Sequence, residues 1–183
     1  MFPLRNTLKS TLPRGMKHYK LYYLPYVKGA EVNYIYLLYL YGIAEIKEGY
    51  TKSVVCFSSY GDLASKINSA FSPPSNSKKK SVISADTVSR VLKNESYKPF
   101  FEVVKKDKCN YLVLNNYFKG VKGKAFIRLI PPIYTLLIEQ QDNLLAKYVV
   151  YLIHACGATN NKADFTAKQF LSANGYSLKA KNY

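Results

Sequence analysis

The run from Val32 to Ala44 constrains this sequence more than any other segment. It holds thirteen residues, of which only Asn33 is strongly polar. A membrane-spanning helix needs roughly 18 or more apolar residues in a row, so the run is too short to span a bilayer. Its apolar residues recur at helical spacing and cover almost every side of the helix. The sequence therefore predicts a helix that is central to a core or part of a subunit interface.

This helix leads to a prediction about assembly. It is apolar on more faces than one small domain easily covers, so we expect part of the Val32–Ile43 helix to form a homodimer contact. Tyr34 and Tyr41 are the residues expected at that contact. The alternative is that the helix is simply core, in which case its tyrosines pack there rather than stack on unpaired bases.

The charge of the chain indicates the class of its partner. Its 183 residues include 27 Lys or Arg and 11 Asp or Glu, a net charge of +16. Apolar residues make up 48% of the sequence, which is enough to form a core. Such a surplus of positive charge favours a polyanion, either nucleic acid or an anionic membrane surface, over an acidic protein. It is strongest at the N-terminus, where residues 1–29 carry six cations and no acid and are expected to form a flexible basic arm.

Residues 30–118 show an ordered succession of short elements. After the first helix, the pattern predicts a strand, two helices and a hairpin, in that order. Their expected bounds are Ser53–Phe57 for the strand, Tyr60–Asn68 for a helix capped by Ser58 or Ser59, Ser84–Asn94 for a helix with Ser84 as N-cap, and Phe100–Val104 with Cys109–Leu114 for the hairpin. Pro73-Pro74, several serines and three lysines mark residues 70–82 as a loop.

This succession resembles a winged helix-turn-helix DNA-binding domain. The segments that carry the resemblance are FSSYGDLASKIN, SADTVSRVLKN and FFEVVKKDKCNYLVL, which match a support helix, a recognition helix and a two-stranded wing. The linker over residues 69–83 departs from the family, because the usual turn between the two helices has only 3–4 residues. The resemblance implies a mainly α fold with small β hairpins, of the α+β class.

The second half, residues 119–183, looks like the start of another winged-helix unit. The pattern predicts a strand over Ala125–Ile130, a short helix opened by Pro131-Pro132, a helix over Leu144–Cys156 capped by Asp142 or Asn143 and ended by Gly157, and a helix over Phe165–Ala173 capped by Asp164. No hairpin follows, so this unit is expected to be incomplete, as in a fragment of a longer protein. Tandem units of this kind are similar to replication initiators of bacterial plasmids and phages.

The helix at Ser84–Asn94 is the expected reading element. Thr87, Arg90 and Asn94 lie on one stripe, at i, i+3 and i+7. Arg can bind guanine and Asn can bind adenine in the major groove, whereas the alternative is an ordinary solvated helix face. Residues 76–124 hold twelve Lys or Arg against four acids, which favours a surface that follows phosphates. The candidate DNA-binding residues are Ser84, Thr87, Ser89, Arg90, Lys93 and Asn94 on the helix, Lys78, Lys79 and Lys80 in the loop, Lys105, Lys106 and Lys108 at the hairpin tip, and Ser177, Lys179 and Lys181 near the C-terminus.

The sequence offers no pattern for catalysis, a metal or a cofactor. It has two His, 136 residues apart, no paired-acid motif and no glycine-rich phosphate loop. Its three cysteines have no CxxC spacing, which favours reduced thiols in the cytoplasm of a bacterial cell, or of the host if the protein is viral. With no catalytic pattern in the sequence, the resemblance implies a non-enzymatic, sequence-specific binder of double-stranded DNA in plasmid or phage replication or maintenance. The alternatives are a winged-helix transcriptional regulator and a single-stranded DNA- or RNA-binding protein.

Overall fold

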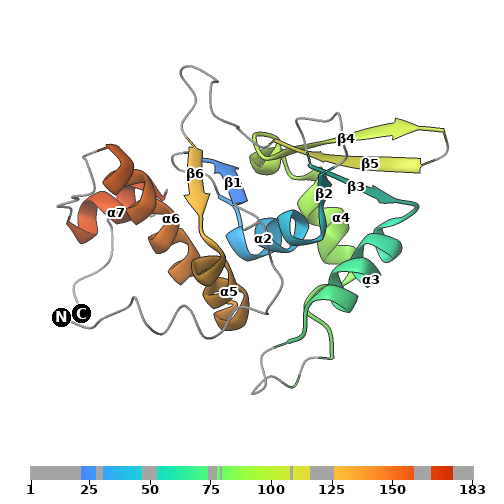
Figure 1. Ribbon diagram of the computed structural model, residues 1–183, viewed down its shortest axis with the longest axis horizontal. Coiled ribbons are helices and arrows are strands. Elements are labelled where there is room, and N and C mark those ends of the chain that lie inside the picture. Colours follow the sequence, from blue (N-terminus) through green and yellow to red (C-terminus); the bar gives the residue numbers. More distant parts are fainter. Residues whose placement is uncertain are drawn as a thin grey trace.

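The computed structural model describes residues 22–27, 31–46, 53–73, 78, 80–107, 109–115, 126–158 and 166–174. Within them the fold is mixed α+β, with helices on both sides of a central helix (Figure 1). The elements are β1 (Tyr22–Pro25), α2 (Tyr34–Ile43), β2 (Glu45–Ile46), β3 (Ser53–Phe57), α3 (Tyr60–Ala70), α4 (Ala85–Lys93), the short 3-10 helix η1 (Glu95–Tyr97), β4 (Phe101–Lys106), β5 (Cys109–Leu114), β6 (Phe126–Leu129), α5 (Pro131–Gln140), α6 (Asn143–Ala158) and α7 (Ala167–Ala173).

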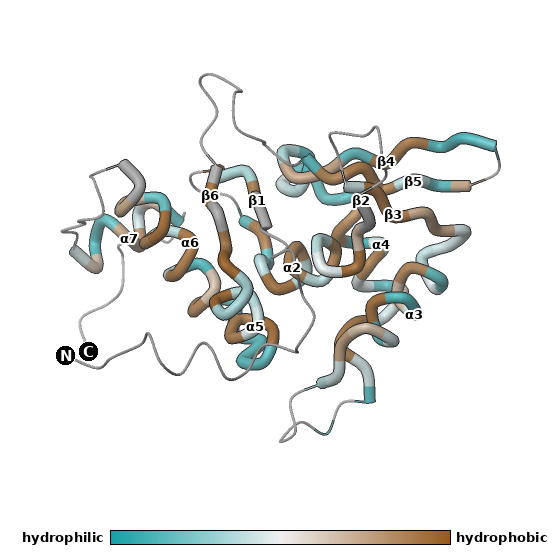
Figure 2. The backbone as a smooth tube through the Cα atoms, viewed as in Figure 1, coloured by the Kyte–Doolittle hydropathy of each residue, from teal (hydrophilic) through white to brown (hydrophobic). Residues whose placement is uncertain are grey.

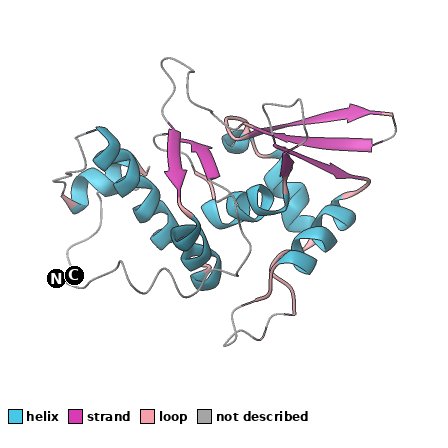
Figure 3. Cartoon of the chain, in the orientation of Figure 1, coloured by secondary structure: helices cyan, strands magenta, loops and turns pink. Residues whose placement is uncertain are grey.

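The strands form two separate antiparallel sheets, as Figure 3 shows. The larger sheet has the order β2-β3-β5-β4, so β5 lies between β3 and the edge strand β4. Val55 of β3 lies opposite Leu112 of β5, and Val103 of β4 lies opposite Leu112 on the other side. The smaller sheet pairs β1 with β6, with Leu24 opposite Ile127.

Helix α2 occupies the centre of the core. Its Asn33 N-cap accepts a hydrogen bond from the Ile35 amide at 2.9 Å, and α2 packs against α3, α5, α6 and β3. Tyr34 and Tyr41, the residues expected at a dimer contact, are each 3% exposed. Figure 2 shows the hydrophobic residues of α2 in the middle of the chain, between the two groups of helices. The chain itself therefore covers this helix, and the exposed apolar surface that the predicted homodimer contact required is not there.

Polar side chains fix α2 to its neighbours. The Tyr34 amide donates to Asn143 Oδ1 of α6, and the Asn33 amide donates to the Tyr97 hydroxyl, each at 2.8 Å. The Tyr134 hydroxyl of α5 donates to the Leu38 carbonyl at 3.0 Å. Gly42 permits this approach, because a Cβ there would collide with the Tyr134 hydroxyl.

The predicted elements of residues 30–118 are found with small changes at their ends. Ser59 rather than Ser58 caps α3, and its hydroxyl accepts from the Asp62 amide at 3.1 Å. The hairpin strands reach Lys106 and resume at Cys109, which leaves a two-residue loop. Asp107 in that loop has φ 49°, the left-handed conformation that tight hairpin turns require.

Three expectations outside this region need correction. Tyr22–Pro25 belong to the predicted basic arm but form β1, whose Leu24 is fully buried. Helix α6 does not end at Gly157 but runs to Ala158. At its N-terminal end the Asp142 carboxylate accepts a hydrogen bond from the Leu144 amide at 2.8 Å. Helix α7 begins after Thr166 rather than Asp164, because Thr166 and Gln169 form a reciprocal capping box.

Candidate nucleic-acid interface

Helix α4 presents the candidate reading face. The Ser84 hydroxyl caps it by accepting from the Thr87 amide at 3.2 Å. Val88 and Val91 are buried, which leaves the opposite side of the helix toward solvent. Arg90 and Lys93 lie in the last turn, where the helix dipole stabilises positive charge. The helix thus exposes a cationic C-terminal half.

Asn68 of α3 holds the backbone that directly precedes α4. Its side-chain Oδ1 accepts from the amides of Val82 and Ile83 at 2.9 and 3.1 Å, and its Nδ2 donates to the Ile83 carbonyl at 2.9 Å. These three bonds attach the end of the long connection to α3, directly before the Ser84 cap. Although the linker is much longer than the usual turn, α3 and α4 pack against each other. The sequence reasoning missed Asn68, which stands at the predicted C-terminus of the helix and gives no local signal.

A hydrogen-bond chain runs along the exposed face of α4. Arg90 Nη2 donates to Thr87 Oγ1 at 3.1 Å, and Thr87 Oγ1 lies 3.0 Å from Ser84 Oγ. Thr87 is half-buried, whereas Arg90 is exposed. The threonine therefore orients the guanidinium, and Arg90 is the side chain of this stripe with the longest reach into solvent.

Asn94 differs from the role expected for it. It is the C-cap of α4, and its Oδ1 accepts from the Ser96 amide at 2.9 Å, which caps η1. The amide that was expected to bind adenine is thus engaged in a local turn. Ser89 is half-buried.

Two further cations flank this face. Lys93 Nζ lies 5.6 Å from the ring centroid of Tyr60, at the start of α3, in a cation–π arrangement. Lys98 forms an exposed ion pair with Glu95, which contributes little to stability. In the loop before α4, Lys78 and Lys80 are exposed, while Lys79 lies outside the described residues.

The hairpin carries its lysines on two faces. Residues 102–106 of β4 are all exposed, and successive side chains of a strand point to opposite sides. Lys105 therefore lies on the same face as the buried Phe101, and Lys106 lies on the other face. Lys108 falls outside the described residues, as do Ser177, Lys179 and Lys181 near the C-terminus.

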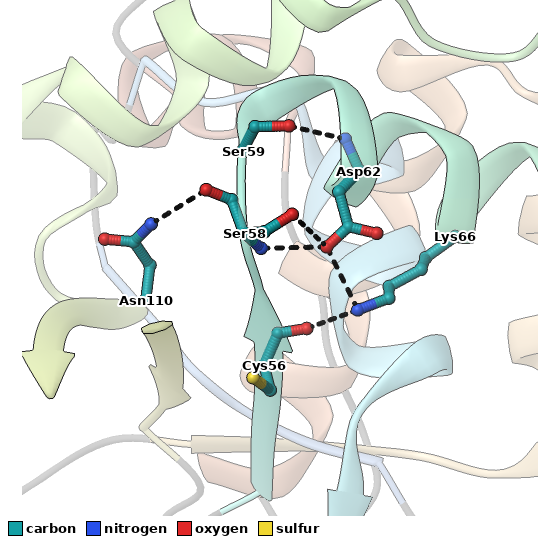
Figure 4. A network of polar contacts seen from close by, with 6 residues as sticks. All are labelled: Cys56, Ser58, Ser59, Asp62, Lys66 and Asn110. Carbon is teal, nitrogen blue, oxygen red and sulfur yellow. Dashed lines mark hydrogen bonds and ion pairs between the residues drawn. The ribbon is translucent and has the colours of Figure 1, made fainter. Parts of the chain in front are cut away.

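A polar network joins the hairpin to the start of α3 (Figure 4). The Asp62 carboxylate accepts from the Ser58 amide at 2.8 Å and from Lys66 Nζ at 3.2 Å. Lys66 Nζ also donates to the Cys56 carbonyl at 2.6 Å. Asn110 Nδ2 of β5 reaches the Ser58 carbonyl at 3.4 Å. The network therefore holds the end of β3, the first turn of α3 and β5 in a fixed relation.

This network predicts a pH dependence of stability. The Ser58 amide, followed by Lys66, lowers the pKa of Asp62 below its ordinary value. A lowered pKa in the folded state stabilises the fold above the ordinary pKa of aspartate, and that contribution is lost as the pH falls through the lowered pKa. In urea unfolding at neutral pH, Asp62→Asn should have a lower midpoint than the unchanged chain. In acid, where Asp62 is protonated, the difference between the two midpoints should become smaller. An equal difference at both pH values would contradict a role for the Asp62 charge.

Most tyrosines of the apolar helix are structural. Burial raises the pKa of Tyr39 to about 12, and Tyr34 is buried against the edge of the Phe100 ring. His154 stacks on Tyr26 with ring centroids 3.7 Å apart, and burial lowers its pKa. These observations show that α2 packs as core and that the His154 ring packs against Tyr26.

The three cysteines are free thiols. Cys56 of β3 lies near Cys109 of β5, and this neighbouring thiol raises the pKa of Cys109. Among the described residues no three His, Cys, Asp or Glu side chains gather as a metal site, and no helix is long and apolar enough to span a membrane.

No protein-family model, curated protein or solved structure matches the chain.

Proposed function

We propose that the chain is a sequence-specific double-stranded DNA-binding protein of the winged helix-turn-helix type. In this proposal α4 lies in the major groove and the β4–β5 hairpin lies on the neighbouring phosphates. Arg90 contacts a base edge, and the surrounding lysines contact the backbone.

The observation that carries the proposal is the arrangement of α3, α4 and the hairpin. Along the chain, α2 is followed by β2 and β3, by the packed helices α3 and α4, and by the β4–β5 hairpin. Strand β3 pairs with β5 and so joins the hairpin to one sheet. This order supports the comparison of α3 with the support helix, of α4 with the recognition helix and of the hairpin with the two-stranded wing. Asn68 joins the support helix to the connection that directly precedes α4, and Asn110 of the hairpin bonds to Ser58, just before the support helix. A recognition helix whose base contacts are specific needs such rigid support.

The charge distribution supports a polyanionic partner. On α4 and the hairpin the cations Arg90, Lys93, Lys105 and Lys106 are all exposed to solvent. Tyr34, Tyr39 and Tyr41 are buried and so are not available to stack on single-stranded bases, whereas Tyr60 and Tyr148 are exposed.

We propose a role in the replication or maintenance of a plasmid or phage. This part of the proposal depends on the resemblance of the two halves to tandem winged-helix initiators. A transcriptional regulator of the same architecture would use the same surface, because the fold does not fix the function. Selection of bound duplexes from a random pool distinguishes the two roles, since the selected sequence can be located at an origin or at a promoter.

The salt dependence of binding tests whether the lysines of the hairpin contact DNA phosphates. Binding to duplex DNA should weaken with a log–log slope of roughly −0.9 for each phosphate contacted. Replacing Lys105, Lys106 and Lys108 together with alanine should reduce the steepness by up to about 0.9 for each lysine that contacts phosphate, with the sequence preference unchanged. Lys168→Ala is the matched control, because Lys168 is exposed on α7, away from the hairpin. A slope unchanged in the triple variant would remove the hairpin from the interface.

A further inference from the structure

Strand β4 is an edge strand with unusual exposure. In the order β2-β3-β5-β4, and within the part of the chain that the structure describes, only β5 pairs with it. Val103 and Val104 are 44% and 43% exposed, on opposite faces of the sheet. An edge strand that exposes valines is a template for pairing with another strand.

The hydrogen-bond pattern identifies the groups at the outer edge. The Asn115 amide donates to the Phe100 carbonyl at 2.8 Å, so residues 100 and 115 form a hydrogen-bonded pair. Such pairs alternate along an antiparallel ladder, and the Lys106–Cys109 pair that closes the hairpin follows the same alternation. The amide and carbonyl groups of Phe101, Val103 and Lys105 therefore point away from β5.

This alternation limits the registers in which β4 can pair with a copy of itself. Outward-pointing residues must lie opposite outward-pointing residues, so a two-fold axis can pass through one residue position but not between two. An axis through Val103 places Glu102 opposite Val104. An axis through Lys105 places the two Lys105 side chains, which carry like charges, opposite each other. An axis through Val104 places Glu102 opposite Lys106 twice, with the two Val104 side chains between these pairs.

We propose that the chain forms a homodimer through antiparallel pairing of β4 with β4 of a second copy, with the two-fold axis at Val104. Each copy contributes Glu102, Val104 and Lys106 to one face of the new ladder, which is self-complementary in charge and apolar in its middle. On the other face, Val103 lies opposite Lys105 of the second copy, whose aliphatic stem covers it.

The dimer does not depend on DNA binding, and it engages Lys106, one of the three lysines that the salt test replaces. The two-fold axis of such a ladder is perpendicular to the sheet, so both copies present the same face of the sheet on the same side. Lys105 shares its face with the buried Phe101, whereas Lys106, which pairs with Glu102, lies on the opposite face. The interface of one strand pair is small, so we expect a weak dimer in exchange with monomer.

Charge exchange tests the pairing. In sedimentation velocity of the full chain, Glu102→Lys and Lys106→Glu should each weaken dimerisation roughly 10-fold, because each places like charges opposite each other twice. The double variant restores both pairs and should recover the dimer to within about 2-fold, with the net charge unchanged. Circular dichroism and urea unfolding check that all variants fold. An unchanged chain that is monomeric at its highest soluble concentration, or a double variant as weak as the single ones, overturns the proposal.

Site-specific crosslinking tests the register. In a chain whose Cys56, Cys109 and Cys156 are replaced with alanine, Val104→Cys places two thiols opposite each other in a pair with Cβ atoms ~5 Å apart. Oxidised glutathione should then produce a covalent dimer, while each disulfide formed releases two molecules of reduced glutathione. Val103→Cys is the matched control and should form no covalent dimer, because its partner in this register is Lys105 and not a second thiol. A crosslink at Val103 rather than Val104, or at neither, overturns the register. None of these results depends on DNA, so a failure here leaves the DNA-binding proposal to its own tests.

Discussion

Replacing Tyr41 with lysine should destabilise the folded chain by roughly 4–5 kcal/mol or more, enough to unfold a large part of it at room temperature. Tyr41 is 3% exposed in the core, and its hydroxyl lies 3.2 Å from the Phe100 carbonyl and 3.0 Å from the Asn115 carbonyl. The variant would bury an ammonium group among apolar side chains and remove the ring that fills this site. Urea unfolding followed by circular dichroism measures the loss.

Two control variants separate the effect of a buried charge at position 41 from the loss of the hydroxyl and from a charge elsewhere on the same helix. Tyr41→Phe keeps the ring and removes the hydroxyl, so it should cost only about 1–3 kcal/mol. Tyr36→Lys places the same charge on the same helix at a half-buried position, where the ammonium can reach water, and should cost clearly less than Tyr41→Lys. If Tyr41→Lys instead gave a folded monomer of unchanged stability, the helix would be a subunit interface and the core described here would be wrong.

Local sequence patterns were sufficient for most elements of residues 30–118. Ser84 could be identified as an N-cap because a serine before an apolar period has a local signature, and the structure has this cap. The hairpin could be predicted because β-branched and aromatic residues flank a short polar turn. The homodimer contact expected at Val32–Ile43 finds no support in the structure, for a physical reason. Hydropathy shows that a helix must be covered but not by what, and part of the cover of α2 comes from α5 and α6, which are distant in the sequence.

Long-range pairing explains the remaining differences. Strand β1 pairs with β6, which lies about a hundred residues later in the sequence. The four residues Tyr22–Pro25 carry no hydrophobic pattern that could have predicted this pairing. Asn68 and Asn110 have the same difficulty, because each fixes two elements through bonds to backbone groups that are distant in the sequence. Thr87 and Arg90 were on the predicted stripe, but the hydrogen bond between them depends on rotamers that spacing does not reveal.

Arg90→Ala tests whether the chain binds DNA sequence-specifically through α4. If Arg90 binds a base edge, the variant should lose about 1–3 kcal/mol on the preferred site, which is roughly 5- to 150-fold in affinity, and accept other bases at one position. Binding to random duplex should fall much less, because there Arg90 supplies one charge among many. Lys93→Ala is the matched control: it removes a neighbouring cation and should weaken both DNAs to a similar extent.

The informative quantity is the ratio of affinities for the selected site and for random duplex, before and after each substitution. Arg90 is exposed and alanine has the higher helix propensity, so the melting temperature should hardly change. Thr87→Val retains the shape of the side chain but removes the hydroxyl that orients the guanidinium, and it should lower the ratio by less than Arg90→Ala does. An unchanged ratio in Arg90→Ala would make α4 a phosphate-binding face and move sequence reading elsewhere in the chain. An equal loss on both DNAs together with a lower melting temperature would make Arg90 structural, and the assignment of α4 as a recognition helix would then be wrong.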